Sequence, residues 1–192
     1  MNWVLRPITR TSLRTCDPAI VEADIKFERE WGNKQIGATN NGNWTTKFGE
    51  ELVRKQFEMD GVQIWKPKRI NGLQPDWETP DHIIEVKTRN WTISGTAGEK
   101  VFGVPYKYSD VPALYGKPLL IVCVAYQEWE LTNVDKYKIF GPGVSENKKK
   151  QLDLWKSMDI HYVPFSKLYK DLGTSNTNEH TEVGGRQETT SE

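Results

Sequence analysis

The chain has 192 residues, 36% of them hydrophobic, and its 26 basic and 26 acidic residues leave no formal net charge. That length fits one domain and is short for two, while eight Trp, seven Tyr and six Phe provide enough apolar surface for a core, which excludes a disordered chain. The neutral total gives no support for nucleic-acid binding. Residues 173–192 hold four acids against one base, however, so the rest of the chain is weakly positive.

No apolar stretch approaches the roughly 20 residues of a membrane span, and the N-terminus lacks the apolar core of a secretory signal. Cys16 and Cys123 are far apart, and Cys123 falls in an apolar run, which predicts a buried reduced thiol. We therefore expect an intracellular protein, cytoplasmic or, in a eukaryotic or viral setting, nuclear.

Two helices are predicted in the first part of the chain. Residues 17–31 open with Asp17-Pro18, an N-cap followed by proline at the first helical position, and carry apolar residues at helical spacing. Residues 32–44 are rich in Gly and Asn and predict a loop. Residues 45–59 predict a second helix that ends at Asp60-Gly61.

The hydrophobic period then changes, and the remaining elements alternate between strand and helix. Short strands are predicted at 62–65, 73–78 and 82–88, and a continuous apolar run predicts a central strand at 119–126. Residues 99–115 are predicted to be only partly helical, because Pro105 and Pro112 interrupt them. Further helices are predicted at 144–158 and 166–172, and a last strand at 160–163. The pattern indicates one α/β domain, residues 1–172, with a mixed central sheet flanked by helices, and a disordered polar tail at 173–192.

The residues with the clearest chemistry lie between positions 74 and 87. Side chains alternate along a strand, so Glu85 and Lys87 share one face of the strand at 82–88 while Ile84 and Val86 point to the other. If residues 78–81 form the turn of a hairpin, Asp76 comes near Glu85, within reach of one shared cation.

This trio suits phosphodiester hydrolysis. Carboxylate oxygens are the ligands of a hard cation, which neutralises charge on a phosphate, and an ammonium group beside them can orient water and stabilise the charge that develops on phosphorus. Two charges in an apolar strand cost burial energy unless they are used. The alternative is a surface strand on which Glu85 and Lys87 form an ordinary ion pair.

Two motifs together carry a resemblance: Pro75-Asp76 followed by Glu85-Val86-Lys87, and a preceding helix that carries Gly49-Glu50. The pattern resembles the PD-(D/E)xK nuclease superfamily, which includes type II restriction endonucleases and Holliday-junction resolvases. The resemblance covers about residues 44–126. It implies a restriction-endonuclease-like core, Mg²⁺ dependence and products with 5′-phosphates, and we expect the metal ligands to be Asp76, Glu85 and Val86. The eight-residue gap between Asp76 and Glu85 is at the tight end of what the family uses.

Two assignments have competitors. The family often adds a glutamate from the preceding helix, and helical geometry places Glu50 at the border of the apolar side while Glu51 points outward, so we assign the catalytic role to Glu50. Pro80-Asp81 also precedes Glu85, but the gap is too short for a hairpin, so we interpret Asp81 as a turn residue. Glu78 is a further possible helper of the metal ligands.

Phosphate contacts are predicted in the segment after the site, through Arg89, Ser94, Thr96 and Lys100. The alternative is a solvated loop. Lys66, Lys68 and Arg69 lie beside the expected cleft, whereas the basic run at 148–150 is more typical of a solvated helix face.

The first hypothesis is a site-specific type II restriction endonuclease that cuts duplex DNA with Mg²⁺, for which Mn²⁺ substitutes and Ca²⁺ does not support cutting. A homodimer is expected because each subunit supplies one active site and two strands are cut. A junction resolvase, a repair nuclease or a homing nuclease stays open within the same chemistry. The hypothesis from another class is a DNA-binding relative that does not cleave.

Overall fold

The computed structural model describes residues 44–88 and 97–168, together with Ala19, Lys26 and Glu30. Its centre is a mixed sheet of four strands in the order β1-β2-β3-β4, in which β1 is antiparallel to β2 and the other pairs are parallel. The strands are β1 (Trp77–Glu78), β2 (Ile83–Thr88), β3 (Leu119–Val124) and β4 (Ile160–Pro164). The predicted mixed α/β architecture is confirmed at this level.

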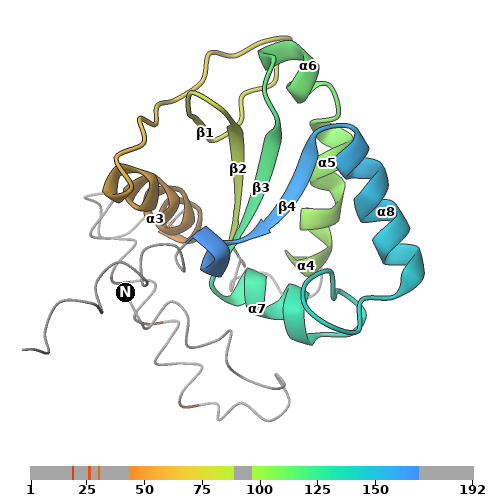
Figure 1. Cartoon of the computed structure of the whole chain (residues 1–192). Helices are drawn as coiled ribbons and strands as arrows, with labels where there is room; N and C mark the ends of the chain where they lie inside the picture. Colours follow the sequence, from red (N-terminus) through yellow and green to blue (C-terminus); the bar gives the residue numbers. More distant parts are fainter. Residues whose placement is uncertain (1–18, 20–25, 27–29, 31–43, 89–96, 169–192) are drawn as a thin grey trace, which may run out of the picture.

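Helix α3 (Trp44–Met59) covers one face of the sheet (Figure 1). Phe48, Leu52 and Val53 recur at helical spacing and are fully buried, and they pack on the side chains of β2 and β3 that point to this face. The helix ends at Asp60-Gly61, where Gly61 takes a φ of 71°, a left-handed conformation that glycine adopts without strain. The predicted helix at 45–59 is confirmed.

The other face of the sheet is covered by short helices and one longer helix, seen beside β4 in Figure 1. They are α4 (Ala97–Lys100), the 3₁₀ helix η3 (Val101–Gly103), α5 (Val104–Lys107), α6 (Val111–Tyr115) and α8 (Glu146–Ser157). Partial helicity at 99–115 is confirmed, but the prolines act differently from the prediction. Pro105 and Pro112 lie in the first turns of α5 and α6, where a missing N–H costs nothing, so they begin helices.

A sharp bend that was not predicted from the sequence follows β3. The predicted strand at 119–126 ends at Val124, Ala125 takes φ 52° and ψ −122°, and α7 (Tyr126–Asn133) follows directly. All residues from Tyr126 to Leu131 are buried. Because a helix that is buried on all sides shows no change of apolar period at its first residue, the predicted strand extended two residues beyond Val124.

Of the three short strands predicted at 62–65, 73–78 and 82–88, the first two are wrong. Of residues 62–65 only Trp65 pairs, through a single bridge to Glu78, and of residues 73–78 only the last two form a strand. Pro67 and Pro75 have no N–H to donate to a ladder, which disfavours pairing on the side of the Trp65–Glu78 bridge that leads toward them. β2, α8 and β4 match the predicted elements to within two residues, and residues 165–168 are helical, as predicted for the start of the last helix.

Several expectations fall on residues outside those described, namely the loop at 32–43, the tail at 173–192, Cys16, Arg89, Ser94 and Thr96. Of the helix predicted at 17–31, only Ala19, Lys26 and Glu30 are described, and all three are helical, whereas Trp44, predicted as the end of the loop, begins α3. Cys123 is a buried free thiol, as predicted. In the described part of the chain, no helix is both long enough and apolar enough to cross a membrane.

Candidate active site

Asp76 and Glu85 lie close together at one end of the β1–β2 ladder, near enough for the charge of Glu85 to act on Asp76. The ladder pairs Trp77 with Ile84 and Glu78 with Ile83, so Asp76 and Glu85 are the residues directly beyond its Trp77–Ile84 end. Trp77 and Ile84 both pack in the core beneath α3. Because neighbouring side chains alternate along β2, Glu85 and Lys87 point to the opposite face, whereas Asp76 reaches the β2 backbone from the end of the ladder.

Asp76 is held by the backbone of β2. Its Oδ2 accepts a 2.7 Å hydrogen bond from the Val86 N–H. Burial, followed by the negative charge of Glu85, raises the pKa of Asp76 from 3.8 to about 7, although the bond from Val86 acts in the opposite direction. The two acids are therefore close enough to repel each other, which is the arrangement that a shared cation relieves.

Glu85 is buried, with 5% of its surface exposed. Its Oε1 accepts a 2.6 Å bond from the Lys87 Nζ. Its Oε2 is buried and makes no hydrogen bond of regular geometry within the described residues. Burying a carboxylate oxygen without a regular hydrogen bond is costly, and the Tyr108 hydroxyl is the neighbouring group that interacts with Glu85, so a bound cation could satisfy the remaining lone pairs of Glu85.

Lys87 remains a cation in this setting. Burial favours its neutral amine, but the charge of Glu85, the hydrogen bond to Glu85 and the charge of Asp76 together outweigh burial and raise the pKa of Lys87. An ammonium group that stays protonated can stabilise negative charge. It is poorly suited to act as a base.

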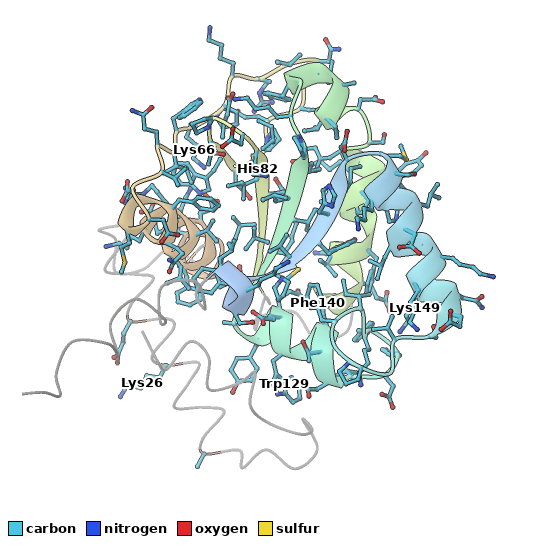
Figure 2. The ribbon with its side chains drawn as sticks, in the orientation of Figure 1. Lys26, Lys66, His82, Trp129, Phe140 and Lys149 are labelled. Carbon is cyan, nitrogen blue, oxygen red and sulfur yellow. The ribbon has the colours of Figure 1, made fainter. Side chains whose placement is uncertain are left out.

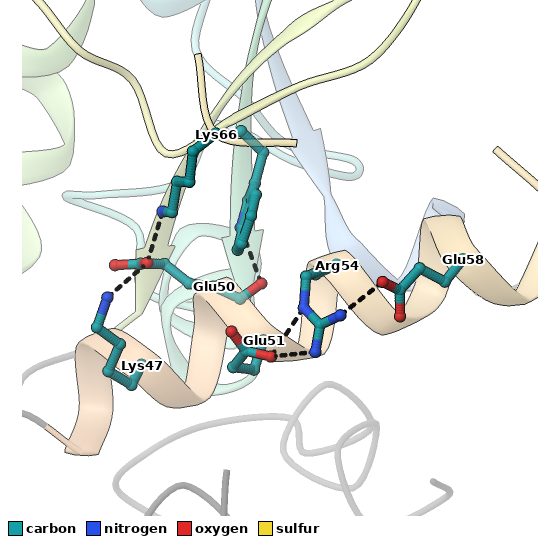
Figure 3. Close-up of polar contacts among 7 residues, drawn as sticks. Lys47, Glu50, Glu51, Arg54, Glu58 and Lys66 are labelled. Carbon is teal, nitrogen blue, oxygen red and sulfur yellow. Dashed lines mark hydrogen bonds and ion pairs between the residues drawn. The ribbon is translucent and has the colours of Figure 1, made fainter. Parts of the chain in front are cut away.

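Glu50 is the glutamate of α3 that faces the site, as predicted. It is 5% exposed and its charge adds to the raised pKa of Asp76. Its Oε2 accepts 3.0 Å bonds from both Lys47 and Lys66, whereas Glu51 pairs with Arg54 along the helix surface (Figure 3). Glu50 is thus near enough to Asp76 to affect its pKa, with one carboxylate oxygen already engaged by two lysines.

The backbone of Glu50 is also part of this network. The Trp77 Nε1–H donates to the Glu50 carbonyl at 3.0 Å, and the Lys66 Nζ lies 4.0 Å from the centre of a Trp77 ring. Next to Glu50, Gly49 lies so close to β2 that an added Cβ would come within 2.5 Å of the Thr88 Cγ2. The Gly49-Glu50 pair therefore sets how near α3 lies to the strand that carries Glu85.

The donor set fits a hexacoordinate hard cation that retains water. Across residues 44–88 and 97–168, no three His, Cys, Asp or Glu side chains are grouped so as to hold a metal ion. Asp76 and Glu85 supply two carboxylates, and the Val86 carbonyl points to the same strand edge as its N–H, which meets Asp76. Mg²⁺ typically takes one or two carboxylates and completes its shell with water and substrate phosphate.

The other acids near the motif are engaged elsewhere. Asp81 is exposed in the bend after Pro80, which supports its interpretation as a turn residue. Glu78, suggested as a helper of the metal ligands, accepts a 2.7 Å bond from Lys117.

The basic residues discussed in the sequence analysis lie on two sides of the molecule. Lys66 bonds Glu50 beside the site, and Lys100 lines a pocket next to Glu85. Lys149 pairs with Glu146 on α8 and lies on the opposite side of the molecule from Lys66 in Figure 2. The run at 148–150 is therefore a helix face remote from the site.

Sequence reasoning missed the wall of that pocket. The pocket has a volume of about 550 Å³, and its lining includes Glu85, Lys87, Lys107, Tyr108 and Gln127. Burial, followed by the charge of Glu85, raises the pKa of Tyr108 to about 12, so its hydroxyl is protonated at neutral pH and can donate. No local pattern marks Lys107, Tyr108 or Gln127, because tertiary packing brings α5 and α7 to the pocket beside Glu85.

Comparisons with known proteins give no relative: no family model, curated protein or solved structure matches the chain. The functional proposal therefore rests on the chemistry of the site itself.

Proposed function

We propose that this chain is a Mg²⁺-dependent endodeoxyribonuclease that hydrolyses phosphodiester bonds of duplex DNA and leaves 5′-phosphates, in the manner of a type II restriction endonuclease. The observation that carries the proposal is the closeness of Asp76 to Glu85 beside Lys87, with a buried oxygen of Glu85 that lacks a regular hydrogen bond. A mixed sheet with α3 packed on the strand that carries Glu85 is compatible with the restriction-endonuclease-like core that the resemblance implies.

Asp76, Glu85 and the carbonyl of Val86 would hold the cation. When bound, Mg²⁺ supplies positive charge that offsets charge on the phosphate and lowers the pKa of water. Mn²⁺, which also accepts oxygen ligands, is expected to replace it, and Ca²⁺ to bind without supporting cleavage.

Lys87 supplies the remaining function. Its Nζ lies 2.6 Å from Glu85 and stays charged, so it can orient a water molecule beside the carboxylates and stabilise the charge that develops on the phosphate oxygens. Mutagenesis of comparable charge-stabilising groups shows losses of about 10²–10³ in rate. Lys87 is therefore expected to contribute to kcat more than to binding.

A homodimer on duplex DNA follows from the proposed reaction. One chain carries one such site, and a double-strand cut requires two, so a two-fold dimer would match a palindromic target.

The experiment is incubation of the protein with supercoiled plasmid in Mg²⁺ and in EDTA. Discrete linear products that appear with Mg²⁺ alone support the proposal, and products from branched substrates alone would assign the same chemistry to junction resolution. Asp76→Asn should remove cutting, while Asp81→Asn, at the neighbouring Pro-Asp motif, should leave it unchanged. Retained gel shift without cleavage under any divalent cation would overturn the proposal in favour of a DNA-binding protein.

Binding of the cation is tested separately by calorimetry with Ca²⁺. The wild type and Asp81→Asn should bind Ca²⁺ alike, and Asp76→Asn should bind it more weakly because one of two carboxylate ligands is gone. Equal affinities for all three proteins would remove Asp76 from the metal site.

A further inference from the structure

The pocket beside Glu85 is larger than the proposed reaction needs. At about 550 Å³ it falls within the roughly 300–1,000 Å³ of small-molecule sites, whereas a phosphate group can be held on an open surface by lysines. Its inner wall combines the apolar Val101 and Val104 with Tyr108 and Gln127, which are almost fully buried. Such a wall can accommodate a sugar or a base as well as a phosphate.

The rim of this pocket is basic. Lys87, Lys100 and Lys107 line it, and Glu85 is the one acid among the described residues that do so. The Lys107 Nζ donates a 3.0 Å bond to the Tyr108 hydroxyl and lies 4.5 Å from the centre of the Tyr108 ring. Lys107 is exposed, and its ammonium group is held against Tyr108, a residue of the pocket wall.

An exposed aromatic residue adjoins Lys107 in the sequence, outside the pocket lining itself. Tyr106 precedes Lys107 on α5 and is 82% exposed, more than any other large hydrophobic residue in the described part of the chain. Exposed aromatic rings beside lysines are how proteins bind unpaired strands, because bases stack on the ring while the cations follow the backbone. A paired base inside a duplex offers no free face to such a ring.

We propose that the pocket takes one unpaired nucleotide of the substrate strand, with its phosphate at Lys100 and Lys107 and the adjacent base stacked on Tyr106. The inference rests on the proposed function for the role of the neighbouring carboxylates, and it deepens that function. In duplex DNA, one nucleotide at the cutting site would have to leave the base stack to enter the pocket.

The test measures binding apart from cleavage. Fluorescence anisotropy of a labelled short single strand, and of a fully paired duplex of the same sequence, is recorded with the full chain in Ca²⁺. The variants are Lys107→Gln and Tyr106→Ala, both at exposed positions. Lys150→Gln is the matched control, since it removes the same charge from exposed α8, outside the pocket.

Tyr106→Ala should weaken single-strand binding about fivefold or more and duplex binding much less, because stacking requires an unpaired base. Lys107→Gln should weaken binding and reduce the magnitude of the slope of log affinity against log salt concentration by about one, the value expected for one lost phosphate contact. Lys150→Gln should behave as the wild type. Equal affinities for Lys107→Gln and Lys150→Gln, or an equal loss for strand and duplex in Tyr106→Ala, would overturn the proposal.

The two proposals fail in distinguishable ways. If the variants show this binding pattern but no substrate is cut in Mg²⁺, the pocket stands and the nuclease assignment fails. If plasmid is cut but the pocket variants bind as the wild type does, the nuclease assignment stands and the pocket proposal falls.

Discussion

Replacing Asp76 by Asn should stabilise the protein while it removes activity. Asn keeps an oxygen that can accept the bond from the Val86 N–H, but it carries no charge to repel Glu85. The folded protein raises the pKa of Asp76 from 3.8 to about 7. A pKa difference of that size corresponds to a ceiling of about 4 kcal/mol, at about 1.36 kcal/mol for each pKa unit.

The sign follows from proton linkage. Below pH 4 the Asp76 carboxyl is protonated in the folded and unfolded states, so it does not change the free energy of unfolding. Between pH 4 and 7 the unfolded chain loses this proton while the folded chain keeps it, so the wild type loses stability as pH rises. Asp76→Asn lacks that loss, and the difference between the two proteins should be largest above pH 7.

Thermal and urea unfolding in EDTA, from pH 4 to pH 8, measure the effect. For a chain of this size, Tm changes by about 2–4 °C per kcal/mol, which sets a ceiling of roughly 10–15 °C at pH 8. Asp81→Asn, exposed in the turn, should follow the wild type at every pH. A wild type as stable as Asp76→Asn at pH 8, or one that gains stability relative to it as pH rises, would refute the electrostatic reasoning.

Three further substitutions test the surroundings of the acids. Lys87→Ala should lower kcat for plasmid cleavage by about 10²-fold or more with little change in DNA affinity, and full activity would exclude Lys87 from the mechanism. Gly49→Ala should destabilise by about 1–3 kcal/mol in urea unfolding, because the new methyl meets Thr88, whereas a stabilised variant would show that α3 can move away. Glu50→Gln should cost about 1–3 kcal/mol by the same measurement and Glu51→Gln less than about 1, since only Glu50 is almost fully buried; equal costs would contradict the network at Glu50.

The elements that sequence reasoning found are those with a clear period of their own. α3 was found because its apolar residues form one stripe, and β2 because its side chains alternate around Glu85 and Lys87. α7 was not found, because its buried residues include Gln127, Glu128 and Glu130, whose burial depends on tertiary packing. Strand pairing before β1 was overestimated, since Pro67 and Pro75 interrupt it.

The same distinction, between local pattern and tertiary packing, applies to the residues of the candidate site. The relation of Asp76 to Glu85 and Lys87 could be predicted, because a hairpin and strand alternation define it within a dozen residues. The contacts of Glu50 with Lys66, sixteen residues away, and of the pocket with Tyr108 could not, because they depend on how helices dock on the sheet. Local geometry thus indicated the candidate site residues, and tertiary packing determined their surroundings.

The bonds of Glu50 make folding and assembly of the site a single event. One residue of α3 holds Lys66 by its side chain and the indole of Trp77 by its carbonyl, so a helix that frays at this turn also releases the residue next to Asp76. The amide protons of α3 should therefore exchange with solvent at rates that report on the integrity of the acidic pair. Selection on catalysis would then also preserve the helix, including positions that never touch a substrate.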